Sequence, residues 1–210
     1  MTSQKAFYFD ASACTGCKAC QIACQDQNGL SADILWRRVF QYGGGSWEPD
    51  NSVPGLYRAN NVYAYSVSTA CMHCEDAICV DVCPAGAITK REDGVVLIDQ
   101  EKCIGCRYCE WACPYGAPAF NEAKGVMSKC TFCEDLQAKG ENPACVDACV
   151  MRALDFGELD ELRARYGNVN AIEPLPTANI TNPSLVITPH KLSQASGAGT
   201  GKVLNLPEEV

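Results

Sequence analysis

Cysteine spacing is the feature that most constrains this chain. Its 210 residues include 16 cysteines, which fall into four groups of four with none left over. The groups are Cys14, Cys17, Cys20 and Cys24 (group one); Cys71, Cys74, Cys79 and Cys83 (group two); Cys103, Cys106, Cys109 and Cys113 (group three); and Cys130, Cys133, Cys145 and Cys149 (group four). Thiolates bind soft metals and iron–sulfur clusters. Complete quartets therefore predict metal centres whose binding is coupled to folding.

Three kinds of cross-link use cysteines in such numbers. A disulfide framework is typical of short secreted domains, and the beginning of this sequence lacks the apolar segment of a secretory signal. Structural zinc uses pairs of Cys-x-x-Cys, and each group here begins with one. Groups one and three, however, have three cysteines at two-residue spacing and a fourth after three more residues. That is the bacterial ferredoxin pattern, so the spacing favours iron–sulfur clusters, with zinc as an alternative.

The fourth cysteine of the ferredoxin pattern binds the neighbouring cluster rather than its own. Groups two and three are adjacent in sequence, and we expect them to exchange fourth ligands. By internal repetition, we expect groups one and four to do the same. The predicted ligand sets are Cys14, Cys17, Cys20 and Cys149 (cluster one); Cys130, Cys133, Cys145 and Cys24 (cluster two); Cys71, Cys74, Cys79 and Cys113 (cluster three); and Cys103, Cys106, Cys109 and Cys83 (cluster four).

These pairings predict an α+β fold of two bacterial-type ferredoxin-like lobes, each holding two [4Fe–4S] clusters. A β-hairpin insertion and an extended C-terminal arm complete it. The predicted boundaries are 1–30 for the first half of the outer lobe, 31–66 for an aromatic hairpin insertion, 67–120 for the inner lobe, 121–166 for the second half of the outer lobe and 167–210 for the tail.

Several local patterns fill in this outline. The Asp-Gly in 91–94 predicts a hairpin between strands at 88–90 and 95–98. The insertion is expected to turn at its glycine run, 43–45. A helix is expected at 158–166. The Pro-, Ser- and Gly-rich tail is either disordered or an arm that wraps a partner subunit and orders on binding. The apolar residues 185–187 favour the arm.

Composition excludes several functions. The net charge of −8 argues against nucleic acid and anionic lipid as main partners. The longest apolar run is strand length, so we expect no membrane span. The sequence contains neither a dinucleotide-binding glycine motif after a strand nor a phosphate-loop lysine motif, and no catalytic residues are predicted. One-electron transfer through a row of clusters is the remaining chemistry.

Four residues in or beside the cysteine loops are candidates for tuning cluster potentials. Lys18, Arg107 and Lys129 place cations there, and a cation stabilises the more negative reduced cluster. The alternative is that they are ordinary surface charges. His73 lies between Cys71 and Cys74, whose quartet is already complete. We expect a packing or hydrogen-bonding role for it rather than ligation.

The cysteine groups, together with CIGCRYCEWACPYGAPAFNEAKG, REDG and RALDFGELDELR, resemble the iron–sulfur subunit of dimethyl sulfoxide reductase-type molybdoenzymes. The resemblance runs essentially end to end. It implies a large catalytic subunit with a molybdenum bis-pterin guanine dinucleotide cofactor and an integral membrane subunit that exchanges electrons with quinol. It also implies membrane association through these partners. Co-export with the catalytic subunit then favours the extracytoplasmic face over the cytoplasm.

Two positions test the resemblance. Some relatives replace one group-three cysteine by tryptophan and hold a three-iron cluster; Cys106 here implies four [4Fe–4S] clusters. Val150 stands where a proline often follows the last cysteine, which puts the turn after Cys149 in doubt. The same ligands would also serve a free-standing polyferredoxin for soluble oxidoreductases, or a zinc-stapled interaction scaffold.

Overall fold

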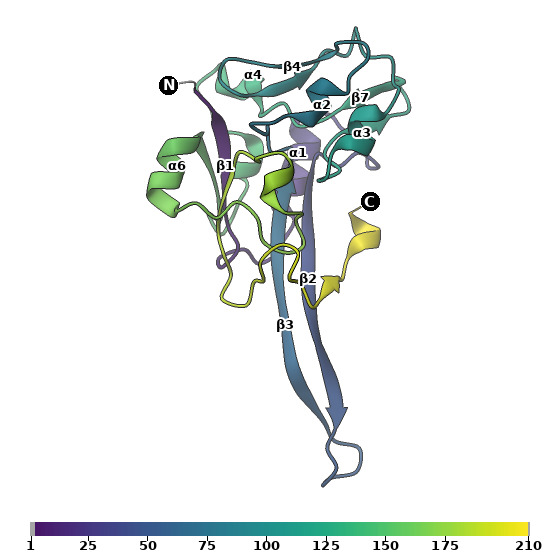
Figure 1. Ribbon diagram of the computed structural model, residues 1–210, viewed down its shortest axis with the longest axis vertical. Helices are drawn as coiled ribbons and strands as arrows, with labels where there is room; N and C mark the ends of the chain where they lie inside the picture. Colours follow the sequence, from purple (N-terminus) through teal and green to yellow (C-terminus); the bar gives the residue numbers. More distant parts are fainter. Residues whose placement is uncertain (1–2, 210) are drawn as a thin grey trace.

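The computed structural model describes residues 3–209, which form the mixed α+β fold expected from the sequence (Figure 1). Short helices and hairpins are joined by the cysteine loops. The elements in chain order are β1 (Lys5–Asp10), α1 (Ala19–Gln27), β2 (Arg37–Pro49), β3 (Tyr57–Ala70), α2 (Ile78–Asp81), β4 (Ile88–Lys90), β5 (Val96–Ile98), α3 (Tyr108–Ala112), β6 (Ala119–Asn121), β7 (Val126–Ser128), α4 (Glu134–Gln137), α5 (Ala144–Asp147), β8 (Leu154–Glu158), α6 (Leu159–Tyr166), η1 (Ala178–Ile180), β9 (Leu185–Thr188), β10 (Lys202–Val203) and η2 (Leu206–Glu208).

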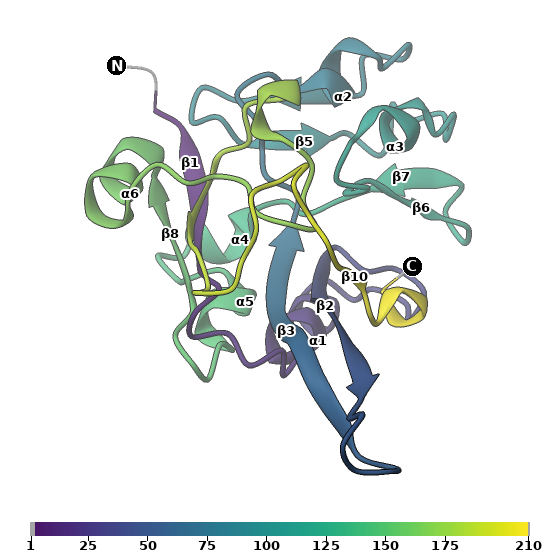
Figure 2. The ribbon, with the colours of Figure 1, turned by 60° about the horizontal axis from the view of Figure 1, so that its bottom comes forward.

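Strand β1 lies between β8, which is antiparallel to it, and β9, which is parallel to it. Its side chains alternate between two faces, as a strand requires. Phe7 and Phe9 face the main core, whereas Ala6 and Tyr8 pack with Leu159 of α6. This sheet therefore brings together segments from the beginning, the middle and the tail of the chain (Figure 2).

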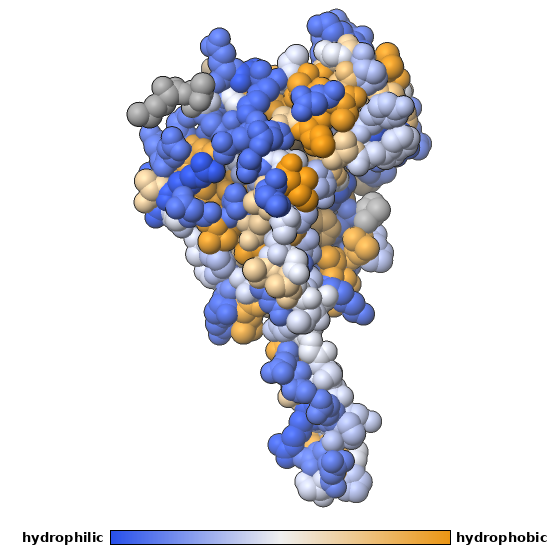
Figure 3. Space-filling view, viewed as in Figure 1, coloured by the Kyte–Doolittle hydropathy of each residue, from blue (hydrophilic) through white to orange (hydrophobic). Residues whose placement is uncertain are grey.

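The aromatic insertion is a long antiparallel hairpin of β2 and β3 that projects from the body (Figure 1). Its base is buried, with Val39 and Val67 each 1% exposed. Its far end is covered mainly by hydrophilic side chains (Figure 3). The base of the hairpin thus belongs to the core, and the rest is an arm.

The predicted turn at the glycine run is wrong, because the strands reverse at residues 50–56 instead. The glycines lie inside β2, where the register shifts between Gly44 and Ser46 and Gly45 has φ 99°. This is a β-bulge, in which glycine supplies the left-handed backbone. A Cβ at Gly43 would lie 2.7 Å from the carbonyl oxygen of Tyr63, so close strand contact also requires glycine there.

The C-terminal tail packs on its own chain, which shows that the first of the two alternatives, a disordered tail, is wrong. Strand β9 joins β1, and β10 pairs with the edge of β2. Beyond β10, the Asn205 side chain accepts a hydrogen bond from Gln41 N (2.8 Å) and donates one to Val39 O (2.9 Å). The tail therefore covers backbone groups that an edge strand would leave unpaired.

Between the cysteine loops lie two small hairpins, β4–β5 and β6–β7. The first is the hairpin predicted from the Asp-Gly turn, and Gly94 has the left-handed φ of 80° that such a turn uses. Ile88, Val96 and Met127 form a small core with Cys109. Across the described residues, no helix is long and apolar enough to cross a membrane.

Candidate metal centres

The structure brings the cysteines together in four sets drawn from different loops. Three cavities are each lined by four cysteines, and we name them sites one, three and four. The remaining set, site two, lies in the main core, where Cys24, Cys130 and Cys145 belong to one buried cluster. Burial raises the pKa of Cys24 and of Cys130, and the other cysteine sulfurs of the set raise both pKa values further. The sets are Cys14, Cys17, Cys20 and Cys149 (site one); Cys24, Cys130, Cys133 and Cys145 (site two); Cys71, Cys74, Cys79 and Cys113 (site three); and Cys83, Cys103, Cys106 and Cys109 (site four).

The first turn of every cysteine loop has the same backbone feature. The residue immediately before the second cysteine has a left-handed φ: 71° at Gly16, 43° at His73, 69° at Gly105 and 62° at Phe132. Such a residue bends the chain sharply, and the cysteines on either side then line one cavity at sites one, three and four. His73 and Phe132 are bulky residues, so the four loops share a backbone conformation rather than a residue type at this position.

The turn after the fourth cysteine also repeats. Ala87 N donates to Cys83 Sγ (3.3 Å), and Ala153 N donates to Cys149 Sγ (3.2 Å). Arg152 has a φ of 53°, close to the 59° of Gly86 at the matching place in the earlier loop. Val150 therefore leaves the turn after Cys149 intact.

Further backbone amides point at cysteine sulfurs. Met127 N donates to Cys103 Sγ at 3.3 Å, and Phe132 N donates to Cys130 Sγ at 3.4 Å. Hydrogen bonds to the sulfurs and solvent exposure are among the factors that set the potential of an iron–sulfur cluster. These loops thus direct backbone amide dipoles at the cysteine sulfurs that could act as ligands.

Burial makes the free thiolates unfavourable. It raises the pKa of Cys14 to about 11 and the pKa values of Cys24, Cys74 and Cys79 to about 12. Metal ligation needs the thiolate, so a cationic centre must offset this burial and binding must release protons. Within residues 3–209, no three His, Cys, Asp or Glu side chains converge to chelate a single metal ion. An all-thiolate set around a cavity fits a [4Fe–4S] cluster.

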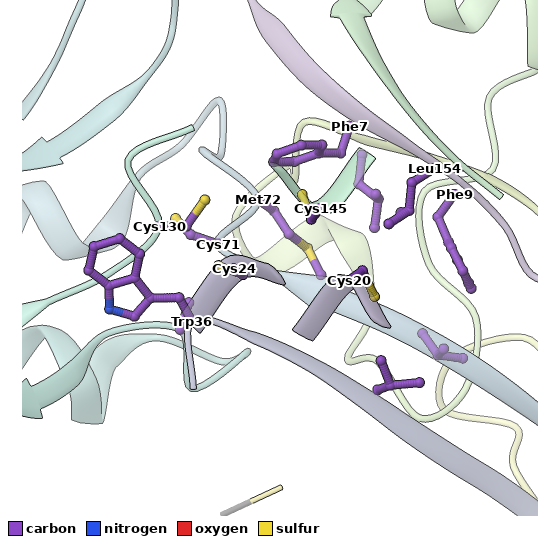
Figure 4. Packing of buried hydrophobic residues seen from close by; sticks show 14 of the residues in the cluster. Phe7, Phe9, Cys20, Cys24, Trp36, Cys71, Met72, Cys130, Cys145 and Leu154 are labelled. Atoms are coloured by element: carbon purple, nitrogen blue, oxygen red, sulfur yellow. The ribbon is translucent and has the colours of Figure 1, made fainter. Parts of the chain in front are cut away.

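Figure 4 shows how the sulfurs of sites one to three lie within the main core. The labelled cysteines are packed with Phe7, Met72 and Trp36. The Trp36 indole donates to Ser128 Oγ at 3.1 Å, which satisfies its polar atom inside the core. Apolar side chains around a metal site limit solvent access and so influence its potential.

Two of the predicted tuning residues are buried beside site three. Lys129 is 3% exposed and lines that cavity, and its ammonium donates to the carbonyls of Val96 and Cys130. His73 is 1% exposed, and its Nδ1 accepts from Val96 N at 3.0 Å. Burial, with Lys129 nearby, holds the pKa of His73 well below its usual range. The histidine is therefore neutral and hydrogen-bonded, in keeping with the packing role expected for it.

The other two predicted tuning residues are neutralised by carboxylates. Lys18 contacts Glu208 at 2.5 Å and the buried Glu209 at 2.7 Å, so it ties the site-one loop to the C-terminal tail. Arg107 is exposed and forms an ion pair with Glu110 at 2.7 Å. An exposed, paired cation has a weak field at a distance because water and its partner screen it.

Sequence reasoning missed a buried cation, Arg37, which is 3% exposed. It lies at the start of β2, and its Nη1 donates to Ser68 Oγ at 3.1 Å. The available signal was alternation, since Arg37 is two residues before the buried Val39 and so faces the same side of the strand. Arg37 was overlooked because it lies outside every cysteine group.

The fold and the cysteine sets define an iron–sulfur electron-transfer protein, and comparison with known proteins agrees. The 4Fe-4S dicluster domain family matches residues 62–159. The sequence is 50% identical to the B subunit of anaerobic dimethyl sulfoxide reductase from Escherichia coli K12 over 210 residues, the full length of both proteins. It is 38% identical to a thiosulfate reductase electron transfer subunit of Salmonella typhi, covering 77% of this protein and 79% of that one. It is 34% identical to the B subunit of polysulfide reductase from Wolinella succinogenes, with 91% and 97% covered.

The chain therefore belongs to the family of iron–sulfur subunits of dimethyl sulfoxide reductase-type enzymes, as its sequence resemblance indicated. It is an electron-transfer subunit of a reductase complex rather than the catalytic subunit. Its 16 cysteines and dicluster domain fit four [4Fe–4S] clusters.

Proposed function

We propose that this chain relays single electrons through four [4Fe–4S] clusters between a quinol-linked membrane subunit and a molybdopterin catalytic subunit. The observation that supports it best is that cysteines of successive sets share hydrophobic clusters. Cys20 of site one, Cys130 and Cys145 of site two and Cys71 of site three all belong to the main core. Cys79 of site three packs in one apolar cluster with Cys109 of site four.

Each site is proposed to bind the cluster of the same number with the four cysteines of its set. The exchange of fourth ligands is supported by the three cavities, each lined by all four cysteines of one set. At site two it is supported by the thiols, which raise one another's pKa. The repeated left-handed loop residues and fourth-cysteine turns support two ferredoxin-like lobes with the boundaries predicted above. The outer lobe would join residues 1–30 to 121–166, and the strand pairing of β1 with β8 supports that union.

When bound, a [4Fe–4S] cluster takes up or releases one electron at a potential set by its surroundings. The chain's residues bind it, hold it in place and limit the water around it. Phe9, Val39 and Leu154 line site one, and Ile78 and Tyr115 line site three. Tyr115 also accepts a hydrogen bond from Thr181 Oγ1 at 3.2 Å, so a residue of the tail helps to close that site.

Lys129 is the strongest of the predicted tuning residues, since it is buried at site three and, among residues 3–209, its hydrogen-bond partners include no carboxylate. We assign it the role of raising the potential of that cluster. His73 would hold the strand beside it, through Val96. Lys18 and Arg107 are weaker candidates, because their charges are compensated by Glu208, Glu209 and Glu110.

The proposed partners follow from the relatives, whose names assign them to dimethyl sulfoxide, thiosulfate and polysulfide reductases. The molybdenum bis-pterin guanine dinucleotide cofactor would reside in the catalytic subunit, with dimethyl sulfoxide as the terminal acceptor. Attachment to the membrane would be peripheral, through the membrane subunit, on the extracytoplasmic face reached by co-export.

The test is anaerobic affinity purification of the tagged full chain from its native host, with metal analysis of everything that co-purifies. Four clusters require about 16 irons and about 16 acid-labile sulfides per chain. We expect a molybdenum-containing subunit in the same complex. Purification of the chain alone with full iron would favour a free polyferredoxin, and zinc with little iron would contradict the proposal.

A further inference from the structure

Arg37 is a cation enclosed by the main core. Its side chain lines an internal cavity with Phe7, Cys71 and Met72, and its guanidinium carbon lies 4.9 Å from the centre of the Phe7 ring. Nη1 donates to Ser68 Oγ, and Nε has no hydrogen-bond partner. The guanidinium is thus shielded from water and only partly hydrogen-bonded.

A buried charge of this kind needs an opposite charge. Desolvating an isolated ion costs several kcal/mol or more, so buried charges are paired or lie beside metal centres. None of the ion pairs within residues 3–209 includes Arg37. Within residues 3–209, its counter-charge therefore comes from a group other than a carboxylate.

The groups in position to supply it are cysteine sulfurs. Cys145, Cys130 and Cys24 of site two and Cys20 of site one all favour the charged form of Arg37 electrostatically. A hydrogen-bonded path also connects Arg37 to site one, since Ser68 Oγ lies 3.1 Å from Arg37 Nη1 and 3.4 Å from Cys20 Sγ. Arg37 thus lies between the two outer sites: Ser68 connects it to Cys20 of site one, and the Phe7 ring that it covers packs on Phe132 of the site-two loop at 4.3 Å.

We propose that Arg37 is a positioning residue for electron transfer: its buried charge compensates the thiolate-ligated clusters of sites one and two and raises their reduction potentials. This inference rests on the proposed ligand sets. Reduction adds negative charge to a cluster, and a fixed cation in a low-dielectric interior stabilises that state. The effect should be larger at sites one and two than at site four.

The position of Arg37 in the fold fits this role. Its Cα pairs with that of Ala70 across the hairpin, and Cys71 of site three follows Ala70 directly. The base of the hairpin therefore carries the cation to the junction between the outer and inner sites. Arg58, at the far end of the same hairpin, is exposed and paired with Asp50, and it serves as a matched control.

The experiment compares Arg37→Gln, Arg37→Lys and Arg58→Gln in the full chain, purified anaerobically within its complex. Iron is counted first, and the midpoint potential of each cluster is then followed by redox titration with electron paramagnetic resonance. Cys24→Ser identifies the resonance of site two. We expect Arg37→Gln to lower the potentials of sites one and two more than that of site four, Arg37→Lys to stay near the native values and Arg58→Gln to change nothing.

Unchanged potentials in an iron-replete Arg37→Gln, or equal shifts at all four clusters, would overturn the inference. If Arg37→Gln fails to take up iron, the Arg37→Lys variant shows whether the charge at residue 37 is what matters. Full iron loading and native reduction potentials in the lysine variant support the role of charge. If neither variant takes up iron, the shape of the arginine side chain is what matters, and the inference is overturned. Too little iron in the native protein would instead overturn the proposed function itself, so the two failures are distinguishable.

Discussion

The outer sites, one and two, and the inner sites, three and four, use the same loop geometry in different surroundings. Every cysteine of the inner sites lies within residues 71–113, whereas the outer sites unite loops from the two ends of the cysteine region. All of site two is buried in the structure; in site four, only Cys109 is. The inner sites are organised locally, and the outer sites depend on the whole fold. Four predictions test this contrast, from the largest expected effect to the smallest.

Removal of iron should have the largest effect. Chelation under anaerobic conditions is expected to unfold both regions, because metal binding supplies folding free energy, of order 10 kcal/mol for a structural zinc site. The sheet β8–β1–β9 should lose its protection more completely than the β4–β5 hairpin, since its strands come from distant parts of the chain whereas a short turn joins β4 to β5. Hydrogen exchange with mass spectrometry measures this. If the sheet and the hairpin lost hydrogen-exchange protection equally, or not at all, the proposed difference between the outer and inner regions would be wrong.

Single ligand changes should separate the regions next. Cys145 is 4% exposed in the main core, so Cys145→Ser should release the site-two cluster and destabilise the fold. Cys106 lies half-buried at site four, and Cys106→Trp should leave a folded protein with a three-iron cluster there. Resonance spectra and melting temperatures report both effects. An unchanged spectrum for Cys106→Trp would contradict its assignment as a ligand.

Apolar truncations provide a matched pair without touching a ligand. Ile187 is 0% exposed in the core beneath the outer sites, whereas Ile104 in the site-four loop is 68% exposed. Ile187→Ala should lower the free energy of unfolding by about 2–5 kcal/mol. Ile104→Ala should change it by less than about 0.5 kcal/mol. Denaturant unfolding of the iron-loaded protein measures both, and similar losses would show that the inner loop is less independent than proposed.

The smallest predicted effect concerns Lys129 at site three. Lys129→Met removes the donor to the carbonyls of Val96 and Cys130, which should cost about 1–3 kcal/mol. It should also lower the potential of cluster three, with Lys102→Met as an exposed control. Redox titration checks the second effect. A lower potential at site two but not at site three would show that Lys129 acts on the outer region instead.

Sequence reasoning was most successful where the structure is local. The Asp-Gly turn predicted the β4–β5 hairpin because turn chemistry acts over a few residues. It failed at Gly43 to Gly45, because a bulge and a turn require the same left-handed backbone, and only the pairing partner distinguishes them. It left two alternatives open for the tail, whose order depends on the exposed edge of β2. An unpaired strand edge is a property of the fold and has no sequence pattern of its own.

By itself the sequence predicted the ligands and their grouping and determined the class of cofactor, because cysteine spacing along a short loop limits which metal centre the loop can bind. Tertiary structure decided the electrostatic setting. Lys18 and Arg107 lie next to cysteines in sequence but are neutralised, whereas Arg37 is 13 residues beyond Cys24 and enclosed among the outer sites. Three cysteines of each set lie close together along the chain, which is why their spacing is informative. The field at a cluster depends on every charge that folding brings near it and shields from water, and residue spacing does not encode that.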